Sequence, residues 1–190
     1  MSFCTRTAIT QPTEFATREA DGNLYIEGYF ALFCSKYWLW DEAYETIDPG
    51  AFDLARDTDV RALTNHDTTL VLGRTTAGTL TLRVDELGLW GSVVINQMDQ
   101  DAVNAYERVR RGDVSQCSFG FDILEQDVEY AEGQPTVWHL RNVKLFEVSI
   151  CTFPAYPDTA VTARKSELDD IQKRKAEEWR QATLRKLKGE

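Results

Sequence analysis

Short apolar stretches separated by polar turns run through most of the chain. Residues 24–33 combine aromatic and aliphatic side chains around Gly28, which is typical of a strand with an internal glycine. Residues 79–84 alternate apolar and polar positions, and this period of two also predicts a strand. Further strands are expected at residues 59–66, 69–73, 90–95, 114–124 and 137–153. Many short strands with turns between them predict a mainly β fold with a few helices, arranged as a closed or nearly closed β-barrel.

Helical spacing is clearest at residues 99–111. Apolar side chains recur there once per helical turn, at Ala102, Ala105, Tyr106 and Val109. Gly112 follows, at the position where a left-handed C-cap is expected. A second, shorter helix is expected at residues 48–52, with Asp48 as its N-cap and Pro49 at the first helical position.

The composition changes near the C-terminal end. Ser166 begins a sequence that resembles a capping box, and the residues after it are rich in Lys, Arg, Glu and Ala, which favour a helix. Their apolar side chains form only a thin stripe, at Leu168, Ile171, Trp179, Ala182 and Leu187. We therefore expect a folded domain at residues 1–163. A charged helical tail is expected at residues 164–190, which docks weakly or binds a partner.

Charge is unevenly distributed along the 190 residues. The whole chain carries a formal net charge of −10 and residues 164–190 carry +3, so residues 1–163 carry −13. An acidic surface repels phosphates, which argues against nucleic acid as a partner. A basic peptide or protein suits this charge better. With 43% hydrophobic residues, the chain is able to build a packed core.

Membrane and secretion signals are not found in the sequence. No run approaches the roughly eighteen apolar residues of a membrane-spanning helix. The first residues also lack the hydrophobic stretch of a secretory signal. The cysteines, Cys4, Cys34, Cys117 and Cys151, form no CxxC pair, so a zinc site is not expected. Reduced thiols in a cytoplasmic setting are the expectation.

Three segments carry candidate catalytic side chains, and the first is residues 64–67, at the end of a predicted strand. His66 in this segment is able to act as a general base near neutral pH, because an unperturbed imidazole has a pKa of about 6.5. An ordinary histidine in a surface loop is the alternative interpretation of this residue taken alone.

The second segment is residues 115–121. Because alternate residues of a strand share a face, the apolar set is Cys117, Phe119, Phe121 and Ile123, and the other set is Gln116, Ser118, Gly120 and Asp122. Ser118 is therefore predicted to point away from the core. Gly120 beside it lets another backbone approach, as an extended substrate peptide requires. A polar solvent-facing surface with a bulge at Gly120 is the alternative.

The third segment is residues 144–150, where both faces of the predicted strand are largely apolar, so a central strand is indicated. Glu147 in its middle is unfavourable there unless it is paired or hydrogen-bonded. A buried carboxylate beside an imidazole orients the ring and stabilises the imidazolium, which is the third role in a catalytic triad. An edge strand with Glu147 facing water is the alternative.

Two other side chains compete for these roles. Cys117 with His66 would form a cysteine protease, although the place of Cys117 on the apolar face predicts a packed thiol. His139 is a rival third member of a triad, in place of an acid, but its position after Trp138 is typical of the start of a strand.

Taken in order, these segments resemble the phage prohead maturation protease family. The matching pieces are Glu27–Phe33, Glu45–Phe52, Asn65–Asp67, Leu72–Thr75, Gly78–Leu80, Gly88–Leu89, Arg111–Val114, Ser118–Phe121, Leu145–Ile150 and Phe153–Tyr156. They cover roughly residues 20–164, and so many pieces in family order are not expected by chance. The aromatic and acidic residues 36–42 depart from the family pattern, which affects the expected substrate preference.

The resemblance implies a herpesvirus-assemblin-like β-barrel surrounded by helices, and a serine endopeptidase that needs no metal or other cofactor. It implies that Ser118 is the nucleophile, that His66 is its base and that Glu147 orients the histidine. We expect the substrate to add as an extended strand along the Ser118 face, in contact with Gly120 and Gln116.

The resemblance also implies the partners. Family members cut the scaffolding segment from the major capsid protein inside the prohead, and often digest themselves afterwards. The expected partners are therefore the major capsid protein and further copies of this chain, in the host cytoplasm and inside the assembling prohead, with neither nucleic acid nor membrane. A non-enzymatic capsid scaffold or interaction module is the competing interpretation, which the tail after Arg164 supports.

Overall fold

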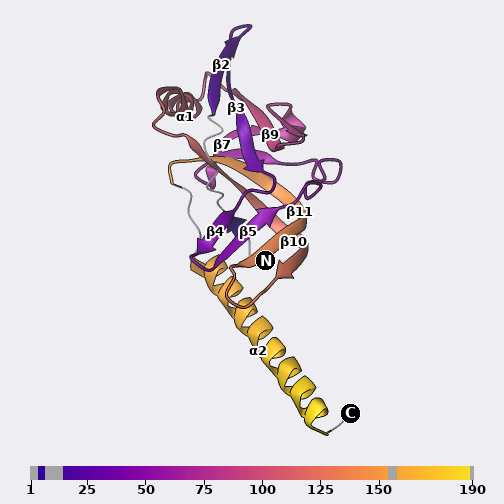
Figure 1. The fold of residues 1–190 in the computed structure, drawn as a ribbon. Coiled ribbons are helices and arrows are strands. Elements are labelled where there is room, and N and C mark those ends of the chain that lie inside the picture. Colours follow the sequence, from indigo (N-terminus) through magenta and orange to yellow (C-terminus); the bar gives the residue numbers. More distant parts are fainter. Residues whose placement is uncertain (1–3, 7–14, 154–157, 189–190) are drawn as a thin grey trace. The chain divides into compact units, whose positions relative to one another are not determined.

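The structure, a computed structural model, describes residues 4–6, 15–153 and 158–188. It divides into two compact units, which we call the body (Met1–Tyr156) and the tail (Pro157–Glu190). Figure 1 shows the strands of the body and the single helix of the tail.

The body contains two β-sheets and one α-helix. The larger sheet consists of β1 (Cys4–Arg6), β4 (Tyr37–Trp40), β5 (Ala43–Ile47), β6 (Arg61–Thr64), β7 (Asp67–Arg74), β10 (Gln116–Glu129) and β11 (Thr136–Cys151). The smaller sheet consists of β2 (Ala16–Ala20), β3 (Asn23–Leu32), β8 (Leu80–Val84) and β9 (Gly88–Ile95), in the order β2-β3-β9-β8. A 3₁₀ turn (Thr75–Ala77) connects β7 to β8, and α1 (Gln100–Arg111) lies between β9 and β10 in the sequence.

The prediction of a closed or nearly closed barrel is wrong. Among the described residues, both sheets are open, because β1, β4 and β7 end the branches of the larger sheet and β2 and β8 are the edges of the smaller one. The cause is the length of β11. Its first part, Thr136–Leu140, pairs in parallel with β5, whereas Glu147–Ile150 pairs in parallel with β6. The sheet therefore forks along β11, and a barrel would need the outer edges to meet. Figure 1 shows β5 and β4 beside one end of the orange β10–β11 hairpin.

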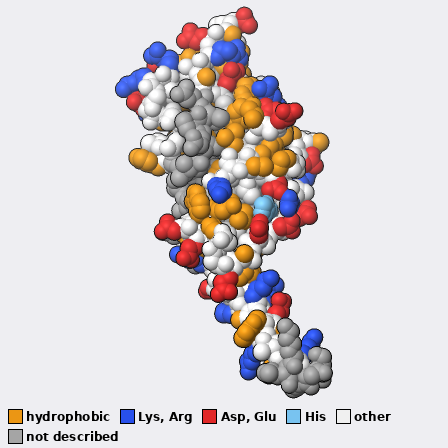
Figure 2. Space-filling view, viewed as in Figure 1, with side chains coloured by type: hydrophobic (Ala, Val, Ile, Leu, Met, Phe, Trp, Pro, Cys, Tyr) orange, Lys and Arg blue, Asp and Glu red, His pale blue; other side chains and the backbone are white. Residues whose placement is uncertain are grey.

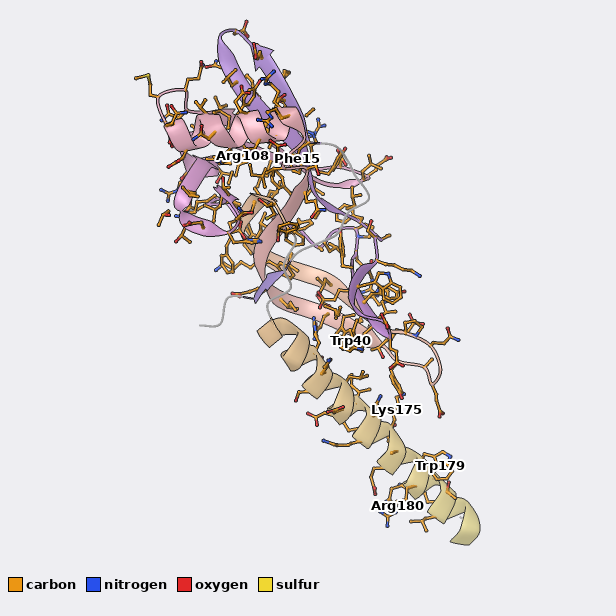
Figure 3. The ribbon with its side chains drawn as sticks, turned by 90° about the vertical axis from the view of Figure 1, so that its left-hand side faces the viewer. Phe15, Trp40, Arg108, Lys175, Trp179 and Arg180 are labelled. Carbon is orange, nitrogen blue, oxygen red and sulfur yellow. The ribbon has the colours of Figure 1, made fainter. Side chains whose placement is uncertain are left out.

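A single hydrophobic core lies between the two sheets. Ile26, Phe30 and Val93 from the smaller sheet belong to the same buried cluster as Phe119 and Val148 from the larger one. Each fully buried side chain of this size contributes about 1.5–3 kcal/mol relative to an exposed one. Phe15, labelled in Figure 3, packs edge-on against Phe30 with ring centroids 5.0 Å apart. The core therefore fixes the inner face of β10 and β11 and leaves their other face for the site.

Most of the elements expected from the hydrophobic pattern are present. The strand predicted at 24–33 is β3, those at 79–84 and 90–95 are β8 and β9, and those at 114–124 and 137–153 correspond to the antiparallel pair β10 and β11. Helix α1 begins after Asp99, whose carboxylate accepts hydrogen bonds from the amides of Asp101 and Ala102. It ends at Gly112 in the left-handed conformation, as the sequence predicts.

The short helix expected at residues 48–52 is absent from this part of the described chain. Gly50 has a φ of 90°, outside the helical region, so the segment forms a turn in which the Ala51 amide donates to the Asp48 carbonyl. Phe52 then forms a parallel β-bridge with Val143. The Pro49–Gly50 sequence therefore forms a turn instead of starting a helix. The turn ends where Phe52 pairs with Val143 of β11.

The tail is one helix, α2 (Asp158–Lys188). It begins before Ser166, where the change in composition had placed its start, so the helix is longer than the sequence pattern indicated. Lys175, Trp179 and Arg180 project from it in Figure 3, and the Trp179 ring is exposed. No helix in the described part of the chain has the length and apolarity that crossing a membrane requires.

Candidate active site

His66 stands in a two-residue turn between β6 and β7. Thr64 pairs with Asp67 across the hairpin, so Asn65 and His66 form its loop, with φ of 51° and 60°. Positive φ at both loop residues is the backbone geometry of the tight hairpin turns that match strand twist. Asn tolerates this region well, and His does so more often than most residues. The turn projects the imidazole beyond the end of the strand.

Strand β11 holds this turn in place. The Asn65 amide donates to the Ile150 carbonyl at 2.9 Å, and the Thr152 amide donates to Asn65 Oδ1 at 2.9 Å. The His66 amide donates to Ser149 Oγ at 3.2 Å. Because these bonds bind two consecutive turn residues to one strand, the position of the imidazole is fixed by β11 as well as by its own hairpin.

The His66 ring forms a short hydrogen bond with Glu147. The distance from His66 Nδ1 to Glu147 Oε1 is 2.7 Å, and both side chains are largely buried. The second carboxylate oxygen, Oε2, accepts a hydrogen bond of 2.6 Å from Ser149 Oγ. Glu147 therefore lies on a central strand with a partner for each oxygen, as its buried position requires. Because Nδ1 is bound to the acid, the other ring nitrogen of His66, Nε2, is the one left to interact with a different group.

Ser118 lies on β10 directly opposite Ser149 of β11. Residues opposite each other in an antiparallel pair point to the same face, and Gly120 faces Glu147 in the same way. The face that carries Ser118 is therefore the face that carries Glu147 and Ser149. Ser118 has no exposed surface (0%).

Gly120 makes room for the acid. A Cβ atom at this position would lie 2.6 Å from Glu147 Oε1, closer than any real side chain tolerates. The absence of a side chain at Gly120 thus lets the carboxylate lie across β10 and reach His66. The sequence suggested a different reason for this glycine, the approach of a substrate backbone, and that role stays a prediction.

The thiol of Cys151 lies close to the His66 imidazole. Cys151 Sγ is 3.8 Å from His66 Nε2. Burial raises the pKa of the Cys151 thiol to about 12, and Cys117 and Glu147 nearby add to the rise. The thiol is therefore neutral at ordinary pH and is a poor nucleophile, since the reactive form is the thiolate.

The rivals weighed from the sequence lie elsewhere. Cys117 points into the core, where its thiol donates to the carbonyl oxygens of Tyr29 and Phe30, on the opposite face of β10 from Ser118. His139 lies near the other end of β11, where its Nδ1 is 3.3 Å from Asp48 Oδ1. Cys117 is therefore on the other face of β10 from Ser118, and His139 is eight residues along β11 from Glu147.

The comparison with known families decides the class of the protein. Residues 11–174 match the family described as caudovirus prohead serine protease. The chain belongs to the caudovirus prohead serine protease family. It is 30% identical over 159 residues to the prohead protease of Enterobacteria phage HK97, a match that covers 80% of this chain and 67% of that relative. Membership makes the chain a protease of phage capsid maturation.

A solved structure is also similar to this prohead protease family member. The capsid assembly protease gp21 of bacteriophage T4 matches with a TM-score of 0.41 and 10% sequence identity. The match covers 80% of this chain and 97% of that structure.

Two contacts at the site were not found from the sequence of this prohead protease. Ser149 and Cys151 follow Glu147 at a spacing of two along β11, so strand periodicity placed all three on one face. Strand periodicity is therefore the signal in the sequence that identifies these two residues. Gln116 is exposed and lies opposite Cys151, at the rim of the same face. The sequence also suggests the turn at residues 154–157 as a source of backbone N–H groups that stabilise the oxyanion, and this segment lies outside the described residues.

Proposed function

We propose that this prohead protease is a serine endopeptidase in which Ser118 is the nucleophile, His66 the general base and Glu147 the acid that orients it. The observation that carries the proposal is the 2.7 Å hydrogen bond from His66 Nδ1 to Glu147 Oε1, on the sheet face that also carries Ser118. A carboxylate on Nδ1 leaves Nε2 as the atom that accepts a proton, which is the arrangement of a catalytic triad.

The chemistry follows from this arrangement. Ser118 Oγ attacks the scissile carbonyl carbon while His66 Nε2 accepts the hydroxyl proton, and Glu147 stabilises the imidazolium that forms. The imidazolium then gives its proton to the leaving amine, which leaves an acyl-enzyme. Water, deprotonated by the same imidazole, releases the acid product. Because every proton transfer passes through the His66 imidazole, the reaction rate depends on the orientation of that ring.

The substrate adds as an extended strand beside β10. One edge of β10 is bound to β11, and among the described strands only β1 pairs with the other edge, through Phe119–Phe121. The pairing with β1 supports the proposal that a peptide adds to this edge, since main-chain hydrogen bonds are a general way to bind peptides. Gln116 at the rim and Gly120 at the centre are the positions that contact the substrate.

The substrate is the scaffolding segment of the major capsid protein, cut inside the prohead in the host cytoplasm, and copies of this chain are a second substrate. The relative from phage HK97 is a prohead protease, which supports a capsid protein as the target. Acidic and basic side chains are interspersed over the visible face of the molecule (Figure 2), and the acidic excess of residues 1–163 suits a basic peptide. The tail is the segment best placed in the chain for removal by self-cleavage.

Co-expression with the major capsid protein of the same phage tests the proposal. Wild-type protease is expected to shorten the capsid protein, and mass spectrometry of the products locates the cut. Ser118→Ala and His66→Ala are expected to abolish the shortening. A capsid protein that is still cut beside Ser118→Ala would exclude Ser118 as the nucleophile. Normal particle maturation with both variants would instead favour a non-enzymatic scaffold.

A further inference from the structure

Ser149 connects the base and the acid of the site. Its side chain is fully buried, and its Oγ accepts a hydrogen bond of 3.2 Å from the His66 amide while it donates one of 2.6 Å to Glu147 Oε2. Glu147 Oε1 in turn binds His66 Nδ1 at 2.7 Å. The three residues therefore form a closed ring of hydrogen bonds that joins the backbone of the base to its own side chain through the acid.

The chemistry of a hydroxyl gives this ring a direction. A serine has one O–H to donate and lone pairs to accept with. Because the Ser149 O–H donates to the Glu147 carboxylate, the lone pairs of its oxygen face the His66 amide. Both contacts are therefore satisfied in a single orientation of the hydroxyl. A carboxylate held at one oxygen still rotates about its last torsion, which is broad. The second contact, from Ser149, removes that freedom at Glu147.

We propose that Ser149 is a positioning residue of the catalytic site, which locks the Glu147 carboxylate and the His66 turn into the geometry for proton transfer. The inference rests on the proposed function. Ser149 touches neither substrate nor the transferred proton. It acts through His66, whose positive φ is disfavoured for a residue with a side chain and therefore needs an anchor.

The smaller sheet contains a matched control. Ser92 is also buried, and its Oγ donates to a glutamate, Glu27 Oε1, at 2.9 Å. Glu27 is bound in addition by Arg18, in an ion pair that involves no histidine. Replacing Ser92 therefore removes the same kind of buried serine–glutamate bond at a place with no catalytic group.

The experiment compares Ser149→Ala with Ser92→Ala in the full chain. The substrate is a peptide that spans the cleavage site mapped by co-expression, and labelling by a fluorophosphonate probe measures nucleophile reactivity without a peptide. For Ser149→Ala we expect kcat and the labelling rate to fall about 10- to 100-fold with KM unchanged, because a hydrogen bond to a charged group is lost. For Ser92→Ala both rates are expected to stay within twofold of wild type.

Two further measurements separate positioning from structural support. The NMR signal of the His66 Nδ1 proton, strongly downfield in a short bond to a carboxylate, is expected to move upfield in Ser149→Ala and to stay in place in Ser92→Ala. Ser149→Thr keeps the hydroxyl in a strand-favouring side chain, so its kcat is expected within about threefold of wild type. This variant also decides the matter if Ser149→Ala does not fold.

The inference is overturned if Ser149→Ala keeps kcat within twofold of wild type, or if Ser149→Thr loses as much kcat as Ser149→Ala. Its failure differs from failure of the proposed function. If only the inference fails, Ser118→Ala and His66→Ala are inactive while Ser149→Ala is active. If the proposed function fails, Ser118→Ala and His66→Ala themselves still cleave the substrate.

Discussion

In the described part of the chain, each of the two histidines forms a close pair with a carboxylate, one towards each end of β11. His66 Nδ1 binds Glu147 Oε1 at 2.7 Å, and His139 Nδ1 lies 3.3 Å from Asp48 Oδ1. Burial barely distinguishes them, because the exposed fractions of the side chains are 22% and 14% in the first pair and 26% and 13% in the second.

The second ring nitrogen distinguishes the two pairs. In His139, Nε2 lies 3.6 Å from another carboxylate, Glu129 Oε2, and Asp48 is shared with Arg141. That imidazole therefore has a carboxylate near each ring nitrogen and belongs to a network of charges. In His66, Nε2 lies 3.8 Å from Cys151 Sγ, on the sheet face that carries Ser118.

Since both imidazoles lie beside a carboxylate, that pairing alone does not single out the proposed catalytic histidine. The distinguishing features are the atom that lies near Nε2 and the kind of group that holds the second oxygen of the acid. Both acids have a partner on each oxygen, but the second partner of Glu147 is the buried hydroxyl of Ser149, whereas that of Asp48 is the exposed guanidinium of Arg141.

Replacing each histidine by alanine has the largest expected effect on this contrast. His66→Ala is expected to lower kcat about 10⁶-fold, because the general base is lost. His139→Ala is expected to leave kcat within twofold of wild type. Cleavage of the mapped peptide, followed by mass spectrometry, measures both. Comparable losses in the two variants would remove the functional distinction between the pairs.

Neutralising each carboxylate gives the next largest difference. Glu147→Gln keeps the shape of the acid but favours the wrong imidazole tautomer, so kcat is expected to fall about 10⁴-fold. Asp48→Asn is expected to leave kcat unchanged and to lower stability by about 1.5–3 kcal/mol, because a largely buried carboxylate loses charged hydrogen bonds to His139 and Arg141. Peptide cleavage and urea unfolding provide the two readouts. An active Glu147→Gln enzyme would show that the imidazole needs no acid.

Gly120→Ala tests whether the position of the Glu147 carboxylate matters for catalysis. The added Cβ would meet Glu147 Oε1 at 2.6 Å, so the acid must shift, and a displacement of this kind costs about 10²-fold in kcat. Gly91→Ala is the control, since its Cβ would meet Phe30 equally closely in the smaller sheet. It is expected to lower the melting temperature and to leave kcat per folded molecule unchanged. Equal kcat for both variants would contradict the role of Gly120.

Alkylation of the cysteines has the smallest expected effect. With a pKa raised to about 12, Cys151 is protonated from pH 7 to pH 9, and iodoacetamide is expected to modify the exposed Cys34 long before it. Activity should survive this treatment, while unfolding in urea should make Cys151 reactive. Peptide mapping follows each site. Loss of activity in step with labelling of Cys151 would point to thiol chemistry at His66.

Local pattern was enough to place most strands, α1 and its caps, and to single out His66, Ser118 and Glu147 as candidates. Period-two alternation assigns faces within a strand, and capping depends on a few neighbouring residues, as at Asp99 and Gly112. These features depend on interactions between residues close in the chain, so the sequence by itself determined them.

The pairing of strand edges was decided only by the tertiary structure. No local pattern states that β11 binds β5 along one part and β6 along another, and this division opens the expected barrel. The same pairing brings the Asn65–His66 turn onto Ser149 and places Cys151 at the imidazole. Such contacts join residues more than eighty positions apart, and their stability depends on the core that packs behind the strands.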